Sequence, residues 1–184
     1  MRFIQVDKKE VAVRKVFISY HRADSRYRHE LASLLKAKGI DYYAVPENAD
    51  FNGKSHESIK SFICNKLKKC DILVCLIGEE TYSRPHVDRE IHTALKGVPG
   101  KRHGIIGVLL PTRRDKLSSI DLNTFPVKLW DNKDYVVWTS WDKLNDSILE
   151  CIKGAKRNAL NPQVQTNHTN PCMLLRCGKY YDDN

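Results

Sequence analysis

The sequence lacks any long hydrophobic run. None of its apolar stretches approaches the ~20 residues that a helix needs to cross a bilayer. The first residues, MRFIQVDKKEVAVRK, contain no apolar stretch long enough for the core of a signal peptide. We therefore expect the protein to stay in the cytoplasm, and we predict no contact with a membrane.

The six cysteines include no CxxC pair. Most of them lie in or beside apolar patterns, where a free thiol behaves as a small hydrophobic group. These are Cys64, Cys70, Cys75 and Cys151. The spacing favours reduced thiols over a disulfide framework or a zinc site, so the sequence predicts no bound metal and no cofactor.

Several motifs of nucleotide-binding and hydrolytic enzymes are also missing. No GxGxxG follows the first predicted strand and no GxxxxGK[ST] occurs anywhere, which argues against Rossmann dinucleotide binding and against a P-loop. A GxSxG elbow and an HExxH zinc motif are absent too. His86 and His92 do not share a helix face, so they form no metal-binding pair.

Positive charge is in excess, and the formal net charge is +9. A basic surface attracts polyanions, including nucleic acid. The basic residues are scattered, however, and no basic stripe with interleaved aromatic residues is present, so nucleic-acid binding is not favoured. We interpret most of this charge as a solvated surface.

The clearest local pattern runs from Cys70 to Leu95. Its apolar run Ile72–Ile77 has the length and β-branched content of a strand that is buried on both faces. After a polar loop, Val87, Ile91, Ala94 and Leu95 recur at i, i+4, i+7 and i+8, which predicts an amphipathic helix.

Glu90 lies near the start of this predicted helix, on the flank of its apolar stripe. Periodicity alone leaves two interpretations open. The carboxylate either faces a crevice above the sheet, or compensates the helix dipole at the surface.

The other elements follow the same alternation of strand and helix. Strands are predicted over 16–20, 40–45 and 104–110, with short ones over 125–130 and 135–138. Helices are predicted over 25–38, 55–67 and from 141 to about 157, and Asp24 or Ser25 and Ser55 are the candidate N-caps. The pattern therefore predicts one α/β domain over 1–157, followed by a C-terminal tail, 158–184, whose order it does not establish.

Repeated strand–helix units with strands buried on both faces predict a parallel sheet between two layers of helices. Right-handed crossovers favour a flavodoxin-like three-layer sandwich with strand order 2-1-3-4-5. In that order the loops after the first and third strands lie side by side, where ligands bind in such folds. These two loops are 20–24 and 78–86.

Three segments, VFISYHRAD (16–24), DILVCLIGEET (71–81) and RPHVDREIHTAL (84–95), together resemble the TIR family. More specifically, the chain resembles the TIR-like proteins of the bacterial Thoeris anti-phage system, of the ThsB type. The resemblance covers residues 14–156 and implies the flavodoxin-like strand order. It also implies an enzyme that cleaves NAD+ between nicotinamide and ribose with one glutamate, which Glu90 matches in the pattern from Val87 to Ile91. The aromatic residue often found just before that valine is His86 here, which departs from the family pattern.

The resemblance further implies that NAD+ is a substrate, that the product is a diffusible cyclic ADP-ribose-type signal, and that a partner effector reads it. It implies self-assembly on activation by a phage-derived trigger, with the loop 47–54 moving on assembly. The candidate substrate-binding residues are Tyr20, His21, Arg26, Arg28, Thr81, Ser83 and His86. For several of them an ordinary structural role stays open, such as packing at the core rim, a solvated surface charge or a helix cap.

Two other functions remain open on sequence grounds. A TIR-like adaptor that acts only through TIR–TIR assembly would have no need for Glu90. A nucleoside-processing transferase of related fold would also use a carboxylate near the third strand.

Overall fold

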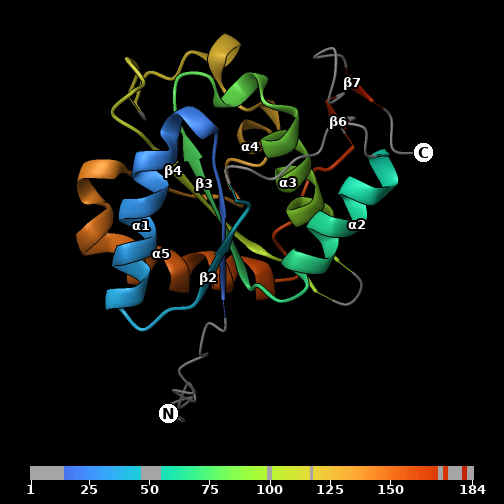
Figure 1. Cartoon of the computed structure of the whole chain (residues 1–184), viewed down its shortest axis with the longest axis horizontal. Helices are drawn as coiled ribbons and strands as arrows, with labels where there is room; N and C mark the ends of the chain where they lie inside the picture. The colour runs from blue at the N-terminus through green and yellow to red at the C-terminus, as the bar shows by residue number, and fades with distance from the viewer. Residues whose placement is uncertain are drawn as a thin grey trace, which may run out of the picture.

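A five-stranded parallel sheet lies at the centre of the molecule (Figure 1). The structure, a computed structural model, describes residues 15–46, 55–98, 101–116, 118–169, 172–173 and 180–181. The strand order is β2-β1-β3-β4-β5, which confirms the predicted fold class and topology. The strands are β1 (Val16–Ser19), β2 (Tyr42–Ala44), β3 (Ile72–Ile77), β4 (Gly104–Leu109) and β5 (Val137–Ser140).

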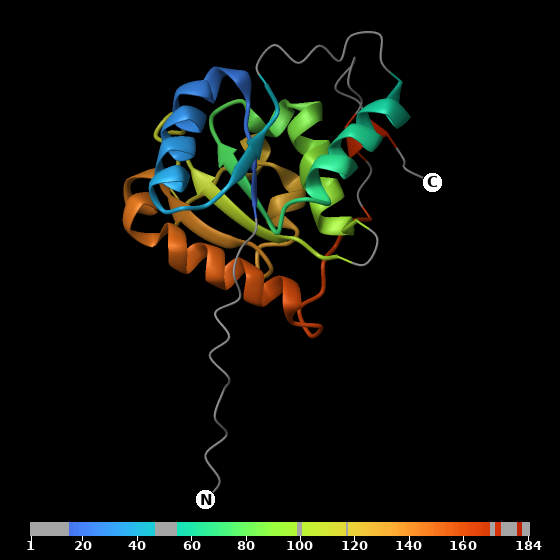
Figure 2. The same cartoon turned by 60° about the horizontal axis from the view of Figure 1, so that its bottom comes forward.

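Helices cover both faces of the sheet. Helices α1 and α5 lie on one face, and α2, α3 and α4 lie on the other (Figures 1 and 2). The helices are α1 (Ser25–Ala37), α2 (His56–Leu67), α3 (Pro85–Lys96), α4 (Val127–Trp130) and α5 (Trp141–Leu160). Single 3-10 turns precede or connect them at η1 (Arg22–Asp24), η2 (Thr81–Ser83) and η3 (Leu122–Thr124).

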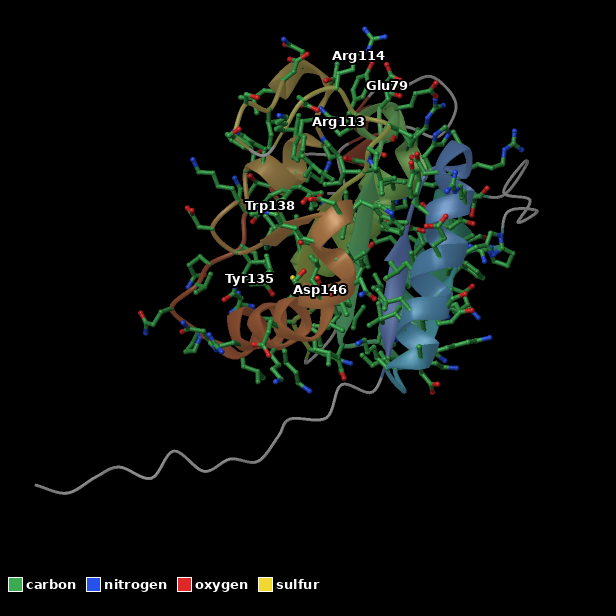
Figure 3. The ribbon with its side chains drawn as sticks, turned by 90° about the vertical axis from the view of Figure 1, so that its left-hand side faces the viewer. Glu79, Arg113, Arg114, Tyr135, Trp138 and Asp146 are labelled. Atoms are coloured by element: carbon green, nitrogen blue, oxygen red, sulfur yellow. The ribbon has the colours of Figure 1, made fainter. Side chains whose placement is uncertain are left out.

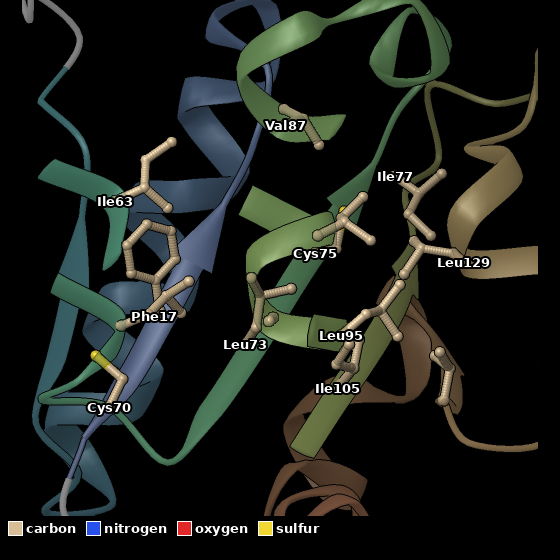
Figure 4. Packing of buried hydrophobic residues seen from close by; sticks show 14 of the residues in the cluster. Phe17, Ile63, Cys70, Leu73, Cys75, Ile77, Val87, Leu95, Ile105 and Leu129 are labelled. Atoms are coloured by element: carbon tan, nitrogen blue, oxygen red, sulfur yellow. The ribbon is translucent and has the colours of Figure 1, made fainter. Parts of the chain in front are cut away.

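Successive side chains of each strand point to opposite faces of the sheet, so the buried side chains form two cores. In β1, Phe17 packs in the core toward α2 and α3, whereas Val16 and Ile18 pack in the core toward α1 and α5. Figure 4 shows the first of these cores, with Val87 of α3 above Cys75 of β3. Because both cores are filled, β1 and β3 are buried along their whole length, as the apolar runs predict.

One of the predicted N-caps acts as expected, and another does not. Ser55 caps α2 by accepting a hydrogen bond from the Ser58 backbone N–H at 3.2 Å, and Gly39, with φ at 71°, ends α1. Asp24 occupies the N-cap position of α1 but makes no capping hydrogen bond. Its carboxylate instead turns into the interior of the protein, where it is 3% exposed.

The strand predicted over 125–130 is wrong, because the chain forms α4 there. The residues are β-branched and aromatic enough to suggest a strand, but Pro126 starts a helical turn by accepting hydrogen bonds from Leu129 and Trp130. The strand predicted over 135–138 is displaced and runs as β5 to Ser140. Tyr135 precedes the strand and is buried, with its hydroxyl donating to the His103 carbonyl at 2.6 Å.

Beyond α5, residues 161–169 attach to the domain through polar contacts. The Arg102 guanidinium donates to the Asn161 carbonyl at 3.0 Å, and the Thr166 hydroxyl donates to the Leu95 carbonyl at 3.2 Å. The short antiparallel pair β6 (Cys172–Met173) and β7 (Tyr180–Tyr181) then lies beside α3 (Figure 1). Residues 1–12, considered as an edge strand or an arm, and the loop 47–54 lie outside the described residues.

Candidate functional site

The candidate site is built on the carboxyl ends of β1, β3 and β4, where parallel strands open toward ligands. Figure 3 shows this end of the molecule at the top, with Glu79, Arg113 and Arg114 around it. The loops after β1 and β3 lie side by side there, because β1 and β3 are neighbours with Ser19 paired to Cys75.

A buried carboxylate connects three of these loops. Asp24 follows β1, Gly78 follows β3 and Thr112 follows β4. The Thr112 hydroxyl donates to Asp24 Oδ1 at 3.4 Å. A Cβ at Gly78 would lie 2.2 Å from Asp24 Oδ2, so only glycine fits beside this carboxylate. Burial raises the pKa of Asp24, and the Thr112 hydrogen bond partly opposes that rise.

Hydroxyl groups of the loop after β3 stabilise the loop itself. Thr81 Oγ1 accepts from the Gly78 backbone N–H at 2.8 Å and donates to the Leu76 carbonyl at 3.3 Å. Ser83 donates to the Glu80 carbonyl at 3.0 Å, and Arg84 pairs with the Glu80 side chain. Thr81 is buried, so a sugar hydroxyl would have to replace one of its two backbone partners in order to bind it.

Arg113 makes several hydrogen bonds near the site, and the sequence did not predict this role. Its guanidinium donates to both oxygens of Asp115, at 2.6 and 2.5 Å, and to the Thr124 carbonyl at 2.6 Å. It also lies over the Phe125 ring, 5.3 Å from the ring centroid. These hydrogen bonds lower the pKa of Asp115. The sequence offered only a pair of basic residues flanking a strand, which carries no signal for a buried, fully bonded arginine.

The end of β1 brings together three of the predicted substrate-binding residues. The Tyr20 hydroxyl donates to the Val45 carbonyl at 3.0 Å, and the Arg28 guanidinium lies 5.5 Å from the Tyr20 ring centroid. His21 is half-buried, and its Nδ1 has no hydrogen-bond partner among the described residues. Burial, together with the cations Arg84 and Arg22, lowers the pKa of His21, so its ring is neutral at pH 7.

The remaining predicted residues lie at the surface. Arg26 has an 83% exposed side chain that pairs with Glu30 at 2.8 Å along α1. His86 is exposed in the first turn of α3. Neither side chain is drawn into the group formed by Tyr20, His21 and Arg28, and their predicted roles stay predictions.

Glu90 lies on the inner side of α3, and only 4% of its surface is exposed. Its helix packs on the sheet through Val87 and Ile91, which belong to the same core as Phe17 and Cys75. By strand alternation Ser19 shares this face with Phe17, so Glu90 faces Ser19 and Cys75 at the carboxyl ends of β1 and β3. Tyr43 of β2 is the third polar neighbour, because the Glu90 charge contributes to its raised pKa, after the larger effect of burial.

Small side chains make room for this carboxyl group. Ser19, Cys75 and Gly107 follow one another across β1, β3 and β4, and we call these three residues the small-residue row. A Cβ at Gly107 would lie 2.5 Å from the Trp138 ring, so the indole fills the space over that end of the row. The space over Ser19 and Cys75 accommodates Glu90.

Burial has a large effect on the ionisation of Glu90. It raises the pKa of this carboxyl group to about 8, and the Ser19 hydroxyl opposes the rise. Burial also raises the pKa of the Cys75 thiol, so the sulfur stays protonated at neutral pH. At pH 7 Glu90 is therefore mostly a neutral acid that sits next to neutral partners.

Two further properties of the described residues concern metal binding and membranes. No group of three or more His, Cys, Asp and Glu side chains is arranged there to hold a metal ion. No helix in the described part of the chain is long and apolar enough to span a bilayer.

The chain is similar, at low sequence identity, to solved structures of TIR domains. Among solved structures, the TIR domain of the Toll-related receptor TRR-2 from Hydra magnipapillata is 16% identical, with a TM-score of 0.49, over 79% of this chain and 98% of that one. The TIR domains of the activated Roq1 resistosome are 17% identical, with a TM-score of 0.41, over 79% of this chain and 83% of that one. No curated protein matches the sequence.

The model of the family described as Thoeris protein ThsB, TIR-like domain, matches residues 17–115, which is more than half of the chain. The match spans β3, β4, the whole of α3 with Glu90, and β1 apart from Val16. This chain therefore belongs to the TIR-like domain family of the Thoeris protein ThsB.

Proposed function

We propose that this protein is an anti-phage defence enzyme that cleaves NAD+ at the nicotinamide–ribose bond. In this proposal it makes a cyclic ADP-ribose-type signal that a partner effector reads. The observation that carries the proposal is the position of Glu90: a buried carboxyl group in α3, opposite Ser19 and Cys75 at the carboxyl ends of β1 and β3.

The chemistry suits a single carboxylate. When the bond between ribose C1′ and nicotinamide breaks, its electron pair leaves with nicotinamide, which departs as a neutral molecule. Positive charge develops on the ribose, as in glycoside hydrolysis, and an ionised Glu90 stabilises that charge. Attack by water gives ADP-ribose and a proton, whereas attack by a nucleophile of the same molecule gives a cyclic isomer.

Glu90 has to lose its proton before it can act in this way. The nicotinamide ring of NAD+ is cationic, and a cation close to a buried carboxyl group favours the ionised form. We therefore expect kcat/KM for NAD+ cleavage to rise about tenfold per pH unit up to the pKa of Glu90 near 8, and then to level off. A profile that is flat between pH 6 and 8 would mean that Glu90 is not the ionising group.

The decisive experiment follows nicotinamide release from NAD+ with the intact protein, alone and with lysate from phage-infected cells. Wild-type protein should release nicotinamide, most strongly with infected lysate, and mass spectrometry should detect a cyclic ADP-ribose isomer. Glu90→Gln and Glu90→Ala should abolish both. Glu150→Gln is the matched control, because Glu150 is an exposed glutamate of α5, outside the loops that follow the strands.

Arg26 and Arg28 are the candidate residues for binding the pyrophosphate of NAD+, and Arg28 has the stronger support. Its guanidinium is held over Tyr20 at the end of β1, whereas Arg26 points into solvent and pairs with Glu30. Arg28→Ala should raise KM for NAD+ about tenfold, the loss expected for one hydrogen bond to a charged group, and Arg26→Ala should leave it nearly unchanged. Thr81 and Ser83 are the weakest candidates, since their hydroxyls are already bonded within the loop.

A non-catalytic adaptor that acts by TIR–TIR assembly is the alternative. The burial and neutrality of Glu90 are compatible with it as well, because a neutral buried acid also serves as a packing group. The two functions separate in one comparison. If Glu90→Gln protein still confers defence in infected cells and no nicotinamide is released by wild type, the adaptor replaces the enzyme.

A further inference from the structure

The Ser19 side chain lies next to Glu90 in the core. Ser19 is the last residue of β1, and none of its surface is exposed. Its hydroxyl makes no hydrogen bond of normal geometry with any described group. A buried hydroxyl without a partner is rare, because it loses its hydrogen bonds to water and gains none in return. This cost suggests a role that the resting structure does not use.

The surroundings of Glu90 leave Ser19 as its best hydrogen-bond donor. Across the sheet, Cys75 presents a thiol, which is a weak donor. Tyr43 of β2 packs its ring against Phe17 at a centroid distance of 5.5 Å. From α2, the buried residues that face this core are the apolar Ile59, Ile63 and Leu67. Among the described residues, two charged groups lie near this cluster: Asp24 acts on it through Cys75, and the Lys66 ammonium of α2 lies 4.6 Å from the centroid of the Tyr43 ring.

We propose that Ser19 is the positioning residue for Glu90: its hydroxyl donates to the Glu90 carboxylate when that group ionises, and so holds the charge toward the bound ribose. Ser19 does not touch the substrate and takes no proton. The role in NAD+ cleavage rests on the proposed function, whereas the interaction between the two side chains does not.

The test follows the ionisation of Glu90 directly, by carbon-13 NMR of the glutamate carboxyl groups across pH 5 to 10. The intact protein is labelled on glutamate, and Glu90→Gln assigns the resonance. Loss of the donor should move the Glu90 midpoint upward by about one pH unit, the size expected for a hydrogen bond to a charged group. We expect this shift in Ser19→Ala and in Ser19→Cys, which is nearly isosteric with the wild type.

Three further variants make the result specific. Ser19→Thr keeps the hydroxyl, so its midpoint should stay within a few tenths of a unit of wild type. Cys75→Ala removes a similar small group from the same row, and should also leave the midpoint in place. Cys75→Ser adds a second hydroxyl opposite Glu90 and should lower the midpoint.

The proposal is overturned if folded Ser19→Ala and Ser19→Cys titrate at the wild-type midpoint, or if Cys75→Ala shifts it as far as they do. Activity gives a separate readout: the pH at which kcat/KM levels off should move upward with the NMR midpoint. If no condition yields NAD+ cleavage while the midpoints shift as expected, the proposed function fails and the role of Ser19 toward Glu90 stands.

Discussion

The missing side chain of Gly78 leaves the space that the Asp24 carboxylate occupies. The Asp24 carboxylate lies so close to the Gly78 α-carbon that a methyl group would be 2.2 Å from Oδ2. Among the residues that the structure describes, only the Thr112 hydroxyl is a side-chain hydrogen-bond partner of this carboxylate. A single glycine therefore keeps the loops after β1, β3 and β4 in contact.

Gly78→Ala should destabilise the protein by about 1–3 kcal/mol, because the added methyl displaces a buried carboxylate. Gly154→Ala is the matched control. Its Cβ would meet the Val137 side chain at 3.4 Å, an ordinary contact, within the long helix α5. Alanine favours helix there by about 0.5–1 kcal/mol. Urea denaturation of both variants gives the comparison, and equal stabilities would contradict the role of Gly78.

The ionisation of Glu90 should appear in the stability of the fold. Its pKa is raised from 4.5 to about 8, so the native state retains a proton that the unfolded chain releases. The contribution of neutral Glu90 is complete below pH 4.5 and is lost as pH rises toward 8, by about 1.4 kcal/mol per unit at the steepest. Glu90→Gln cannot ionise, so its stability relative to wild type should increase by a few kcal/mol between pH 5 and pH 8.

This difference is measured by urea denaturation of both proteins at the two pH values. Glu79→Gln, which changes an exposed glutamate, should follow the wild-type pH dependence. A constant difference between Glu90→Gln and wild type would show that Glu90 titrates normally.

Single residues divide clearly into those that the sequence reveals and those that it does not. Glu90 stands out through its place in a helix after a buried strand, yet periodicity put it on the flank of the stripe and left its burial open. The burial arises from the small-residue row on the neighbouring strands, which no local pattern reports. Arg113 was invisible because its partners Asp115 and Thr124 lie in an irregular segment.

The burial of helix α3 was also only partly predictable from its local sequence pattern. Its amphipathic stripe predicted one buried side, but Arg89, His92 and Thr93 are buried as well, on other sides of the helix. Residues 161–169 reach α3 at Leu95, and β6 lies alongside the helix. An amphipathic pattern identifies the side that meets the sheet, and it carries no information about a later segment that covers the other side.

Helices α3 and α4 are joined by a buried ion pair. The Lys128 ammonium group donates to both oxygens of Asp88, at 2.8 and 3.0 Å, and only 2% of the lysine side chain is exposed. Sequence patterning could not supply this contact, because the two residues are far apart in the chain.

Asp88→Asn should destabilise the protein by about 3–5 kcal/mol, because it leaves the Lys128 charge buried without its carboxylate. Lys128→Met should reduce the free energy of unfolding by less, because the unpaired group is then Asp88. The Asp88 side chain is 14% exposed, whereas that of Lys128 is 2% exposed. Thermal or urea denaturation of the two variants and of the double variant measures the coupling. If the two single variants are equally stable, the pair contributes nothing through burial of its charge.

At the scale of the whole molecule, the strand order could be predicted because alternating elements and right-handed crossovers leave few topologies. The path of residues 161–169 could not. Asn132 donates to the Asn167 carbonyl at 2.7 Å and accepts from its backbone N–H at 2.6 Å. Such contacts between a side chain and a distant backbone have no periodicity, so a polar segment of this kind gives no pattern in the sequence.

Asn132→Ala should release this segment without unfolding the sheet. The two bonds to Asn167 and one to the Lys128 carbonyl are lost, each worth about 1 kcal/mol. Hydrogen exchange should become faster at 161–169 while β1 and β3 stay protected. Asn123→Ala is the control, because Asn123 is exposed and the hydrogen bonds of its side chain and backbone N–H go to Asp121. Unchanged exchange at 161–169 in Asn132→Ala would contradict this attachment.

The small-residue row also limits how this sheet can vary over generations. Any side chain larger than threonine at Ser19 or Cys75, and any side chain at all at Gly107, takes up volume that Glu90 or the Trp138 ring now occupies, and the displaced group has to move outward. Mutational drift is therefore one-sided: exchange among the smallest side chains is tolerated at Ser19 and Cys75 but not at Gly107, and growth carries the acid away from the strand ends. If the proposed NAD+ cleavage were lost in a lineage, larger side chains in the small-residue row would be the first change that we expect.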